Sequence, residues 1–372
     1  MSGYQTFLQT SALIGFWGAF ASNAAFPATS SLQWQIPVAV QLLPGVFLLA
    51  CTLFIPESPC SLIEHGKVEA AEKSLAWLRG LPVGDNDVTN ELCELEETAT
   101  TNGASDLNDR SFFSEAMKPD IRRRLIVGIG LMIAQNMVGL NALNYYAPVI
   151  FMSAGFASVS SSLFLTGVFG LVKLVSAVAF MFVFVRMRGN RFWLKLGSAV
   201  CGVAMLVLAY YVRIMPPPDQ THDAKLTIGG IVSVLMVYIF AFFFGVSLGP
   251  ISWNVCSEIF PSHINAKCCA ITTCTQWLFQ IVIAAITPHL LASVGWATYL
   301  VYAIFCAISF VWVSACVPET RGVPLGRPMD ALFDGDLKDG MTIEEVEEVT
   351  ETTALLRQQR QQRRRSSIAI PV

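Results

Sequence analysis

Charged residues are scarce in this chain. Asp, Glu, Lys and Arg make up 14% of its 372 residues, whereas 54% are hydrophobic and the mean hydropathy is +0.55. Soluble domains carry about 25% charged residues, so the composition excludes that class and indicates a membrane protein. The net charge of −3 provides no broad basic face, which argues against nucleic acid as a partner.

Motifs for metal binding and catalysis are also missing. The ten cysteines include no C-x-x-C pair, which a structural zinc site needs, and most lie in or beside apolar segments as small hydrophobes. There is no H-E-x-x-H motif, and the four histidines are scattered. The sequence therefore predicts that the protein is not an enzyme and binds neither a cofactor nor a metal.

Long apolar runs dominate what is present. A helix needs about twenty apolar residues to cross the roughly 30 Å hydrocarbon core of a bilayer. Eight such runs occur, at residues 3–24, 36–54, 125–151, 163–185, 192–212, 228–249, 264–291 and 296–317. The first is expected to be a span rather than a secretory signal, because residues 1–11 contain no Lys or Arg. The sequence thus predicts an all-α, multi-pass membrane protein with about eight transmembrane helices.

Basic residues between the runs predict the orientation, because cytoplasmic loops keep an excess of Lys and Arg. Eight of these residues lie between 57 and 124, whereas the turns at 25–35, 152–161 and 292–295 contain none. Further basic residues follow the fourth run and fill the end of the chain. Both termini are therefore expected in the cytoplasm.

The one long hydrophilic connection between the runs spans residues 57–123. Apolar residues between 68 and 78 recur at the spacing of one helix face, so short surface helices are expected there. Residues 82–109 are rich in Asp, Asn, Thr, Gly and Glu, which predicts a flexible, solvated connection. The tail beyond residue 325 is expected to be largely disordered.

Short motifs occur at fixed places relative to the apolar runs. They are PESP at 56–59, QNMVGLN at 135–141, GPISW at 249–253, EIFP at 258–261 and VPETRG at 317–322. In this order they resemble the motifs of the sugar porter family of the major facilitator superfamily. The residues within the motifs are similar to those of fungal quinate permeases. The resemblance covers residues 1 to about 333.

The resemblance places the eight runs on helices five to twelve of a twelve-helix fold, so helices one to four have no counterpart. It implies a partial major facilitator fold made of four parts: residues 1–56 (the last two helices of the amino-terminal half), 57–123 (a cytoplasmic linker with short helices), 124–317 (the six-helix carboxy-terminal half) and 318–372 (a cytoplasmic tail). The implied function is transport of quinate or a related sugar-like solute across the plasma membrane by alternating access.

Polar side chains inside the apolar runs are the candidate solute contacts, since an unpaired polar group in hydrocarbon is costly and generally faces a cavity. Gln135, Asn141 and Tyr145 lie on roughly one side of a helix, where they suit a polyhydroxylated ring. Polar contact between helices is the alternative. The resemblance adds further solute-binding positions: Gln9, Asn136, Trp253, Gln276 and Trp277.

Lys173 is a single cation near the middle of the fourth run, too deep to reach the membrane surface easily. Two interpretations stay open. Lys173 could pair with the carboxylate of a hydroxy acid such as quinate, which would separate that solute from a neutral hexose, or it could form an ion pair with a neighbouring helix.

The gate predicted from the resemblance uses carboxylates paired with arginines. The gating residues it implies are Glu57, Arg191, Gly249, Pro250, Glu258, Glu319 and Arg321. Several basic partners are replaced, by Cys60, Asn190 and Asn265. A carboxylate that loses such a partner forfeits about 1 to 3 kcal/mol, enough to shift a balanced gate. Gly249 and Pro250 are expected to interrupt a helix and let it flex.

The expected partners are a small solute, quinate or a hexose, the lipid bilayer and, if transport is coupled, protons. Oligomeric state and proton coupling stay open. Two alternatives to transport also stay open: a nutrient sensor that binds its solute without moving it, and an inactive, shortened paralogue.

Overall fold

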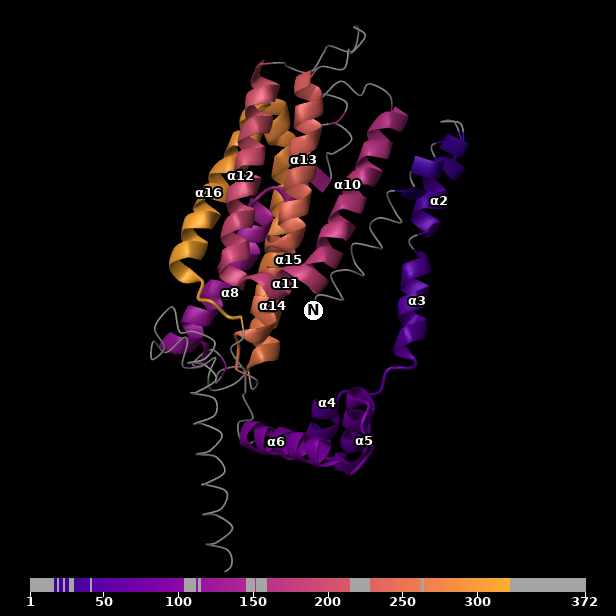
Figure 1. Ribbon diagram of the computed structural model, residues 1–372, viewed down its shortest axis with the longest axis vertical. Coiled ribbons are helices and arrows are strands. Elements are labelled where there is room, and N and C mark those ends of the chain that lie inside the picture. The colour runs from indigo at the N-terminus through magenta and orange to yellow at the C-terminus, as the bar shows by residue number, and fades with distance from the viewer. Residues whose placement is uncertain are drawn as a thin grey trace, which may run out of the picture. The chain divides into compact units, whose positions relative to one another are not determined.

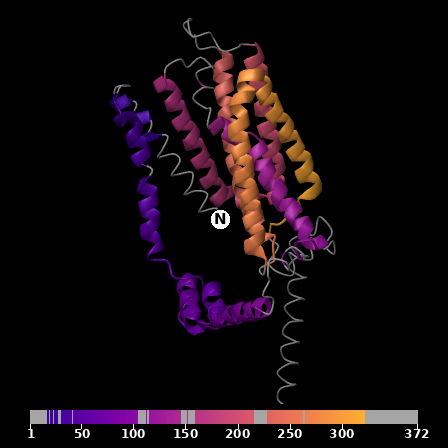
Figure 2. The same cartoon turned by 180° about the vertical axis from the view of Figure 1, so that it is seen from behind.

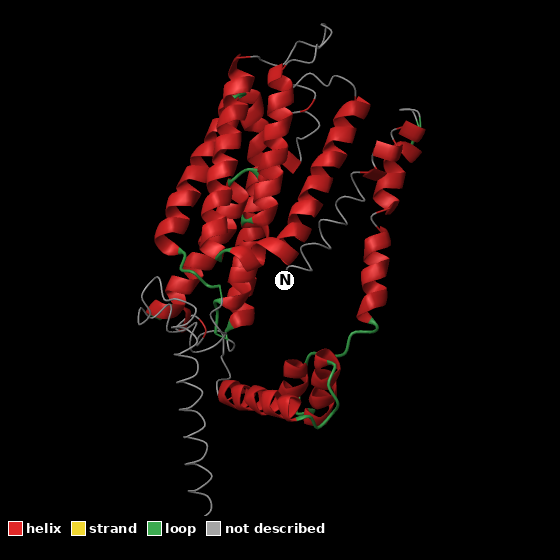
Figure 3. Ribbon diagram, viewed as in Figure 1, coloured by secondary structure: helices red, strands yellow, loops and turns green. Residues whose placement is uncertain are grey.

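The computed structural model describes residues 17–18, 20–22, 24–26, 30–40, 42–103, 112, 115–144, 151, 159–214, 228–261 and 264–321. All regular structure among these residues is helical, as Figure 3 shows, which confirms the predicted all-α class. The chain divides into two compact units, one of residues 1–37 with 119–372 and one of residues 38–118.

Seven helical stretches of the described residues are long and apolar enough to cross a membrane. They are Trp34–Thr52, Pro119–Asn144, Ser160–Met187, Asn190–Ile214, Ile228–Glu258, Asn265–Val294 and Ala297–Cys316. Each overlaps one of the predicted runs. The remaining predicted run, residues 3–24, falls mostly outside the described residues. In its described part, the rings of Trp17 and Phe20 contact Phe164 with centroid distances of 5.8 and 5.7 Å.

The larger unit is a bundle of long helices with roughly parallel axes (Figures 1 and 2). It contains α8 (Pro119–Met137), α10 (Val159–Ala179), α12 (Asn190–Ile214), α13 (Ile228–Val246), α14 (Leu248–Glu258), α15 (Asn265–Val294) and α16 (Ala297–Cys316). A π-helix, η1 (Phe180–Phe184), and the short α11 (Val185–Met187) extend α10. Helix α12 packs against α13 and α16, α8 packs against α15, and α10 packs against α13.

The chain breaks its helical path at Ser247, between α13 and α14. Ser247 has φ −124° and ψ −97°, and its hydroxyl donates to the Phe243 carbonyl at 2.5 Å. The cause lies three residues later, because Pro250 has no N–H to give to the carbonyl four residues earlier and its ring crowds that carbonyl. Gly197 of α12 lies directly against Ser247, where a Cβ would overlap the serine side chain.

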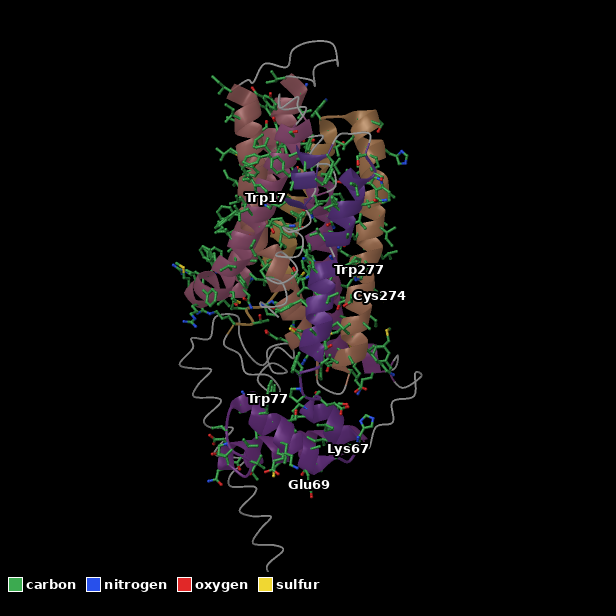
Figure 4. All side chains as sticks on the ribbon, turned by 90° about the vertical axis from the view of Figure 1, so that its right-hand side faces the viewer. Trp17, Lys67, Glu69, Trp77, Cys274 and Trp277 are labelled. Carbon is green, nitrogen blue, oxygen red and sulfur yellow. The ribbon has the colours of Figure 1, made fainter. Side chains whose placement is uncertain are left out.

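The smaller unit contains α3 (Leu42–Thr52), α4 (Pro59–Glu64), α5 (Val68–Arg79) and α6 (Asn86–Gly103), while α2 (Leu32–Val40) spans the boundary between the units. Helices α4, α5 and α6 share a small core of Leu62, Ala71, Leu75, Ala76, Val88 and Leu92. Gly80 ends α5 with φ 66°, and Arg79 donates two hydrogen bonds to Glu91, at 2.9 and 2.6 Å. Side chains of this unit, including the exposed Trp77, are drawn in Figure 4.

The predicted flexible connection at 82–109 is wrong over residues 86–103, which form α6. Val88 and Leu92 lie four residues apart, so both face one side of the helix and are buried against α4 and α5. Composition alone missed this pair, because the polar residues around it are those of an exposed helix face.

Candidate functional site

A network of buried amides joins the end of α8 to the middle of α15. Asn136 is fully buried, and its Nδ2 donates to the carbonyl of Met132 at 3.0 Å and to the backbone carbonyl and side-chain Oε1 of Gln276 at 3.1 and 2.7 Å. The Oδ1 of Asn136 accepts a 2.7 Å hydrogen bond from Asn141 Nδ2. Asn136 therefore holds two candidate solute-binding residues in place.

The backbone partners of Asn136 fix the orientation of every amide in this network. Two main-chain carbonyls can only accept, so the atom facing them must be the Nδ2 of Asn136. Gln276 must then turn Oε1 toward Asn136, and Asn141 must turn Nδ2 toward it. Gln276 Nε2 and Asn141 Oδ1 are left without a hydrogen bond among the described residues.

Gln135 ties this network to the helix break. Its Nε2 donates to the carbonyl of Gly249 at 3.3 Å, in the first turn of α14, and its Oε1 is buried with no hydrogen-bond partner among the described residues. Ser252, one turn along α14, has a buried hydroxyl that also lacks a partner there. A buried polar atom without a partner costs about 1 to 3 kcal/mol, so such atoms are candidates for ligand contact.

The sequence patterns do not single out Ser252 as a candidate ligand contact or Ser247 as the position of the helix break. Residues 245–249 read G-V-S-L-G and match the G-x-S-x-G pattern of hydrolase nucleophiles. That pattern needs a strand-to-helix turn and a histidine partner. Here Ser247 links two helices and donates to a backbone carbonyl, so the match carries no hydrolase chemistry.

Lys173 lies on α10 and is 7% exposed. Its Nζ donates to Asn144 Oδ1 at 3.2 Å and stands 5.7 Å from the centre of the Phe169 ring. Asn144 is three residues beyond Asn141 on the same helical segment, so the lysine and the amide network meet on one stretch of chain.

The two tryptophans of the predicted site differ in position. Trp253 is half-buried on α14, whereas Trp277 is 58% exposed on α15. Because neighbouring residues of a helix point about 100° apart, Trp277 is exposed while Gln276 faces α8. Cys274, also exposed, shares the α15 surface of Trp277 (Figure 4). Gln9 and Tyr145 lie outside the described residues.

Three of the predicted gating residues, Arg191, Glu319 and Arg321, lie where the end of α16 meets the start of α12. Glu319 accepts hydrogen bonds from the backbone N–H groups of Asn190, Arg191 and Arg321, at 2.8, 3.1 and 3.1 Å. Arg191 donates through its guanidinium to the Ser314 carbonyl at 2.5 Å, and Arg321 donates to the Arg186 carbonyl at 2.6 Å. The carboxylate of Glu319 thus caps the helix N-terminus of α12, where anions are stabilised.

The other two predicted carboxylates are placed differently. Glu258, at the end of α14, is half-buried, and its carboxylate makes no hydrogen bond within the described part of the chain. Glu57 is exposed in the smaller unit, where its backbone carbonyl accepts a 2.6 Å hydrogen bond from Ser74. Gly249 and Pro250 are buried in the first turn of α14.

We expect the substitution Glu319→Gln to lower the stability of the bundle by about 1 to 2 kcal/mol. An amide in place of the carboxylate removes the charge and turns a donor toward N–H groups that need acceptors. The melting temperature of the protein in detergent measures this loss. Glu258→Gln is the matched control, and equal shifts for the two variants would show that the helix cap at Glu319 contributes nothing.

Residues 1–330 match the family described as sugar (and other) transporter. This chain belongs to that family. A match over almost the whole chain accounts for the apolar helices and for the order of the motifs between them.

Among curated sugar transporter relatives, two illustrate the likeness. The chain is 33% identical over 335 residues to a "Probable quinate permease" of Aspergillus terreus (strain NIH 2624 / FGSC A1156), and the match covers 89% of this chain and 61% of that protein. It is 31% identical over 335 residues to a "Quinate permease" of Neurospora africana, covering 89% and 62%. The chain therefore spans about three fifths of the length of these relatives.

The fold is that of solved major facilitator transporters. The proton:xylose symporter XylE bound to 6-bromo-6-deoxy-D-glucose matches with a TM-score of 0.71 at 23% identity, over 89% of this chain and 66% of that one. A partially occluded inward open form of XylE from E. coli matches with a TM-score of 0.67 at 24% identity, over 87% and 64%. The predicted family and the predicted fold class are confirmed, and the protein is a multi-pass membrane protein.

Proposed function

We propose that this sugar transporter family member moves a polyhydroxylated solute, quinate or a related sugar-like compound, across a membrane by alternating access. The observation that carries the proposal is the orientation of the buried amides. Gln135 Oε1 and Asn141 Oδ1 remain as acceptors and Gln276 Nε2 remains as a donor, and Gln135 also bonds Gly249 beside the helix break at Ser247.

The chemistry of these free atoms suits hydroxyl groups. A hydroxyl both donates and accepts, so a ring with several hydroxyls can satisfy two amide oxygens and one amide N–H group together. Solutes without hydrogen-bond donors would leave both oxygens unpaired and would be rejected, because a buried unpaired polar atom is costly. The permease names of the relatives support quinate as the solute.

The helix break supports movement. Gln135 is bonded to Gly249, so a bend at Ser247 would change the position of α14 relative to the amide network. Transporters of this general design place their solute beside such interrupted helices. We propose Gly249 and Pro250 as part of the moving element, α14, with Glu258 at its far end, and the Glu319 contacts with α12 as a separate part of the gate.

The proposal also covers the membrane that holds the protein and the coupling of transport to protons. The basic residues between the spans support cytoplasmic termini, and we propose the plasma membrane as the location because the resemblance to quinate permeases implies it. XylE, which shares the fold, is named a proton symporter. None of the eight apolar runs of this chain contains Asp or Glu, so coupling is best tested by the pH dependence of uptake.

Uptake of labelled quinate and labelled glucose by transport-deficient cells that express the 372-residue chain tests the proposal. We expect quinate to accumulate above the level of cells with an empty vector, with membrane insertion verified in the same cells. A rise in uptake as the external pH falls would indicate proton coupling, whereas pH-independent uptake would indicate facilitated diffusion.

Binding distinguishes the alternatives if no uptake occurs. Quinate binding by a well-inserted protein that does not transport would favour a sensor. If the inserted protein shows neither binding nor uptake, the proposed function is contradicted. An inactive paralogue is then the remaining alternative.

A further inference from the structure

Lys173 is a buried cation whose charge is matched by none of the described residues. Its side chain is 7% exposed, and its contacts within the described residues are the Asn144 amide oxygen at 3.2 Å and the Phe169 ring face at 5.7 Å. Lys173 forms no ion pair in this part of the chain. A neutral amide oxygen and an aromatic face stabilise an ammonium only partly.

The sequence supplies no counter-charge at the depth of Lys173. Asp and Glu are absent from all eight apolar runs of the sequence, and the two carboxylates within the membrane-crossing helical stretches of the structure, Asp120 and Glu258, lie at the ends of those stretches. The second interpretation of Lys173, an ion pair with a neighbouring helix of this chain, therefore has no carboxylate to draw on. A buried ammonium without an anion is strongly unfavourable, so an anion carried by a ligand would stabilise Lys173.

We infer that Lys173 is the receptor for a carboxylate on the solute, so that the site takes monoanionic polyhydroxy acids rather than neutral sugars. This inference rests on the proposed function and specifies its substrate class. Asn144 uses one of the three ammonium donors, which leaves two for carboxylate oxygens. One helical turn away, the unshared Oδ1 of Asn141 can accept from a ring hydroxyl of the same molecule.

Charge then sets the selectivity. A monocarboxylate neutralises Lys173 through charge-assisted hydrogen bonds, which are about twice as strong as neutral ones. A neutral hexose can use the amides but leaves the ammonium unmatched. The ring hydroxyls thus provide affinity that acid and sugar share, and Lys173 provides the difference between them.

The test is a binding measurement on the purified 372-residue chain in detergent, by isothermal titration calorimetry, with two ligands that share one ring and differ at the carboxyl group. Quinate carries the carboxylate, and methyl quinate has the same ring with a neutral ester. We expect quinate to bind at least about tenfold more tightly than methyl quinate, as a charge-assisted contact of roughly 1.4 kcal/mol requires.

Variants locate the effect. Lys173→Met should bring the affinity ratio of the two ligands close to one, and Lys173→Arg should keep the preference for quinate. Lys195→Met, which removes a half-buried lysine on α12, is the matched control and should keep the wild-type ratio. Melting temperatures verify that each variant is folded, and the ligand pair tests the wild-type protein even where a variant does not fold.

The outcomes separate the two proposals. Equal affinity of the wild type for both ligands, or a preference for quinate that survives in Lys173→Met, would overturn the role of Lys173 and leave the proposed function standing. A wild type that binds neither ligand would overturn the proposed function and this inference with it.

Discussion

Replacing Asn136 by Asp is expected to abolish solute binding and to lower the stability of the protein by about 3 kcal/mol or more. The substitution keeps the shape of the side chain but replaces Nδ2, which donates to three oxygens, with an oxygen that repels them. The Gln276 and Asn141 amides then lose the partner that orients them. Melting temperature in detergent and quinate binding by calorimetry measure the two effects.

Asn254→Asp is the matched control for this change. Asn254 is half-buried on α14, and its side chain makes no hydrogen bond among the described residues, so the same chemical exchange adds a charge there without removing a contact. If the two variants lose similar amounts of stability and binding, the Asn136 network does not organise the site.

The membrane-crossing helices could be predicted from the sequence because their signal is local. The predicted run at 192–212 corresponds to α12, Asn190–Ile214, and the run at 296–317 corresponds to α16, Ala297–Cys316. A length of about twenty apolar residues is enough to recognise such a helix, whatever it packs against. Hydrophilic helices such as α6 give no comparable signal, since two buried residues per helix suffice to dock them.

The amides of the site could be predicted only as residue types. The pattern picks out Gln135, Asn136 and Asn141 as polar groups in an apolar run, but it treats them alike. The fold distinguishes them, because Asn136 faces the backbone of α15 and is enclosed, whereas Asn141 keeps an oxygen free. That distinction depends on contacts between residues 136 and 276, which no local pattern contains.

The helix break shows that a local sequence rule can predict a feature correctly and still misplace it along the chain. Pro250 marks the interruption in the sequence, yet the backbone departs from the helix at Ser247. Proline disturbs the carbonyl four residues before it, so the break appears upstream of the residue that causes it. The closeness of Gly197 to this break could not be foreseen, because it depends on the packing of α12 against α13 and α14.

Gly197→Ala is expected to cost about 1 to 3 kcal/mol of folding free energy and to reduce uptake of the solute. A Cβ at this position overlaps Ser247 Oγ and lies 3.4 Å from the Phe243 carbonyl, so α12 must move away from the helix break. Melting temperature in detergent measures the stability change, and uptake normalised to inserted protein measures the functional one.

A second substitution at the break tests whether this overlap is the cause. In a Ser247→Gly background the added methyl group has room, so Gly197→Ala should cost less than half of what it costs in the wild type. Gly45→Ala in α3, where a Cβ meets no atom within 4 Å, should be neutral or slightly stabilising, because alanine favours helices more than glycine. If Gly197→Ala lowers the free energy of unfolding by as much in the Ser247→Gly background as in the wild type, the overlap with Ser247 is not the cause. Gly197 is then needed for a reason other than the close approach of α12 to the helix break.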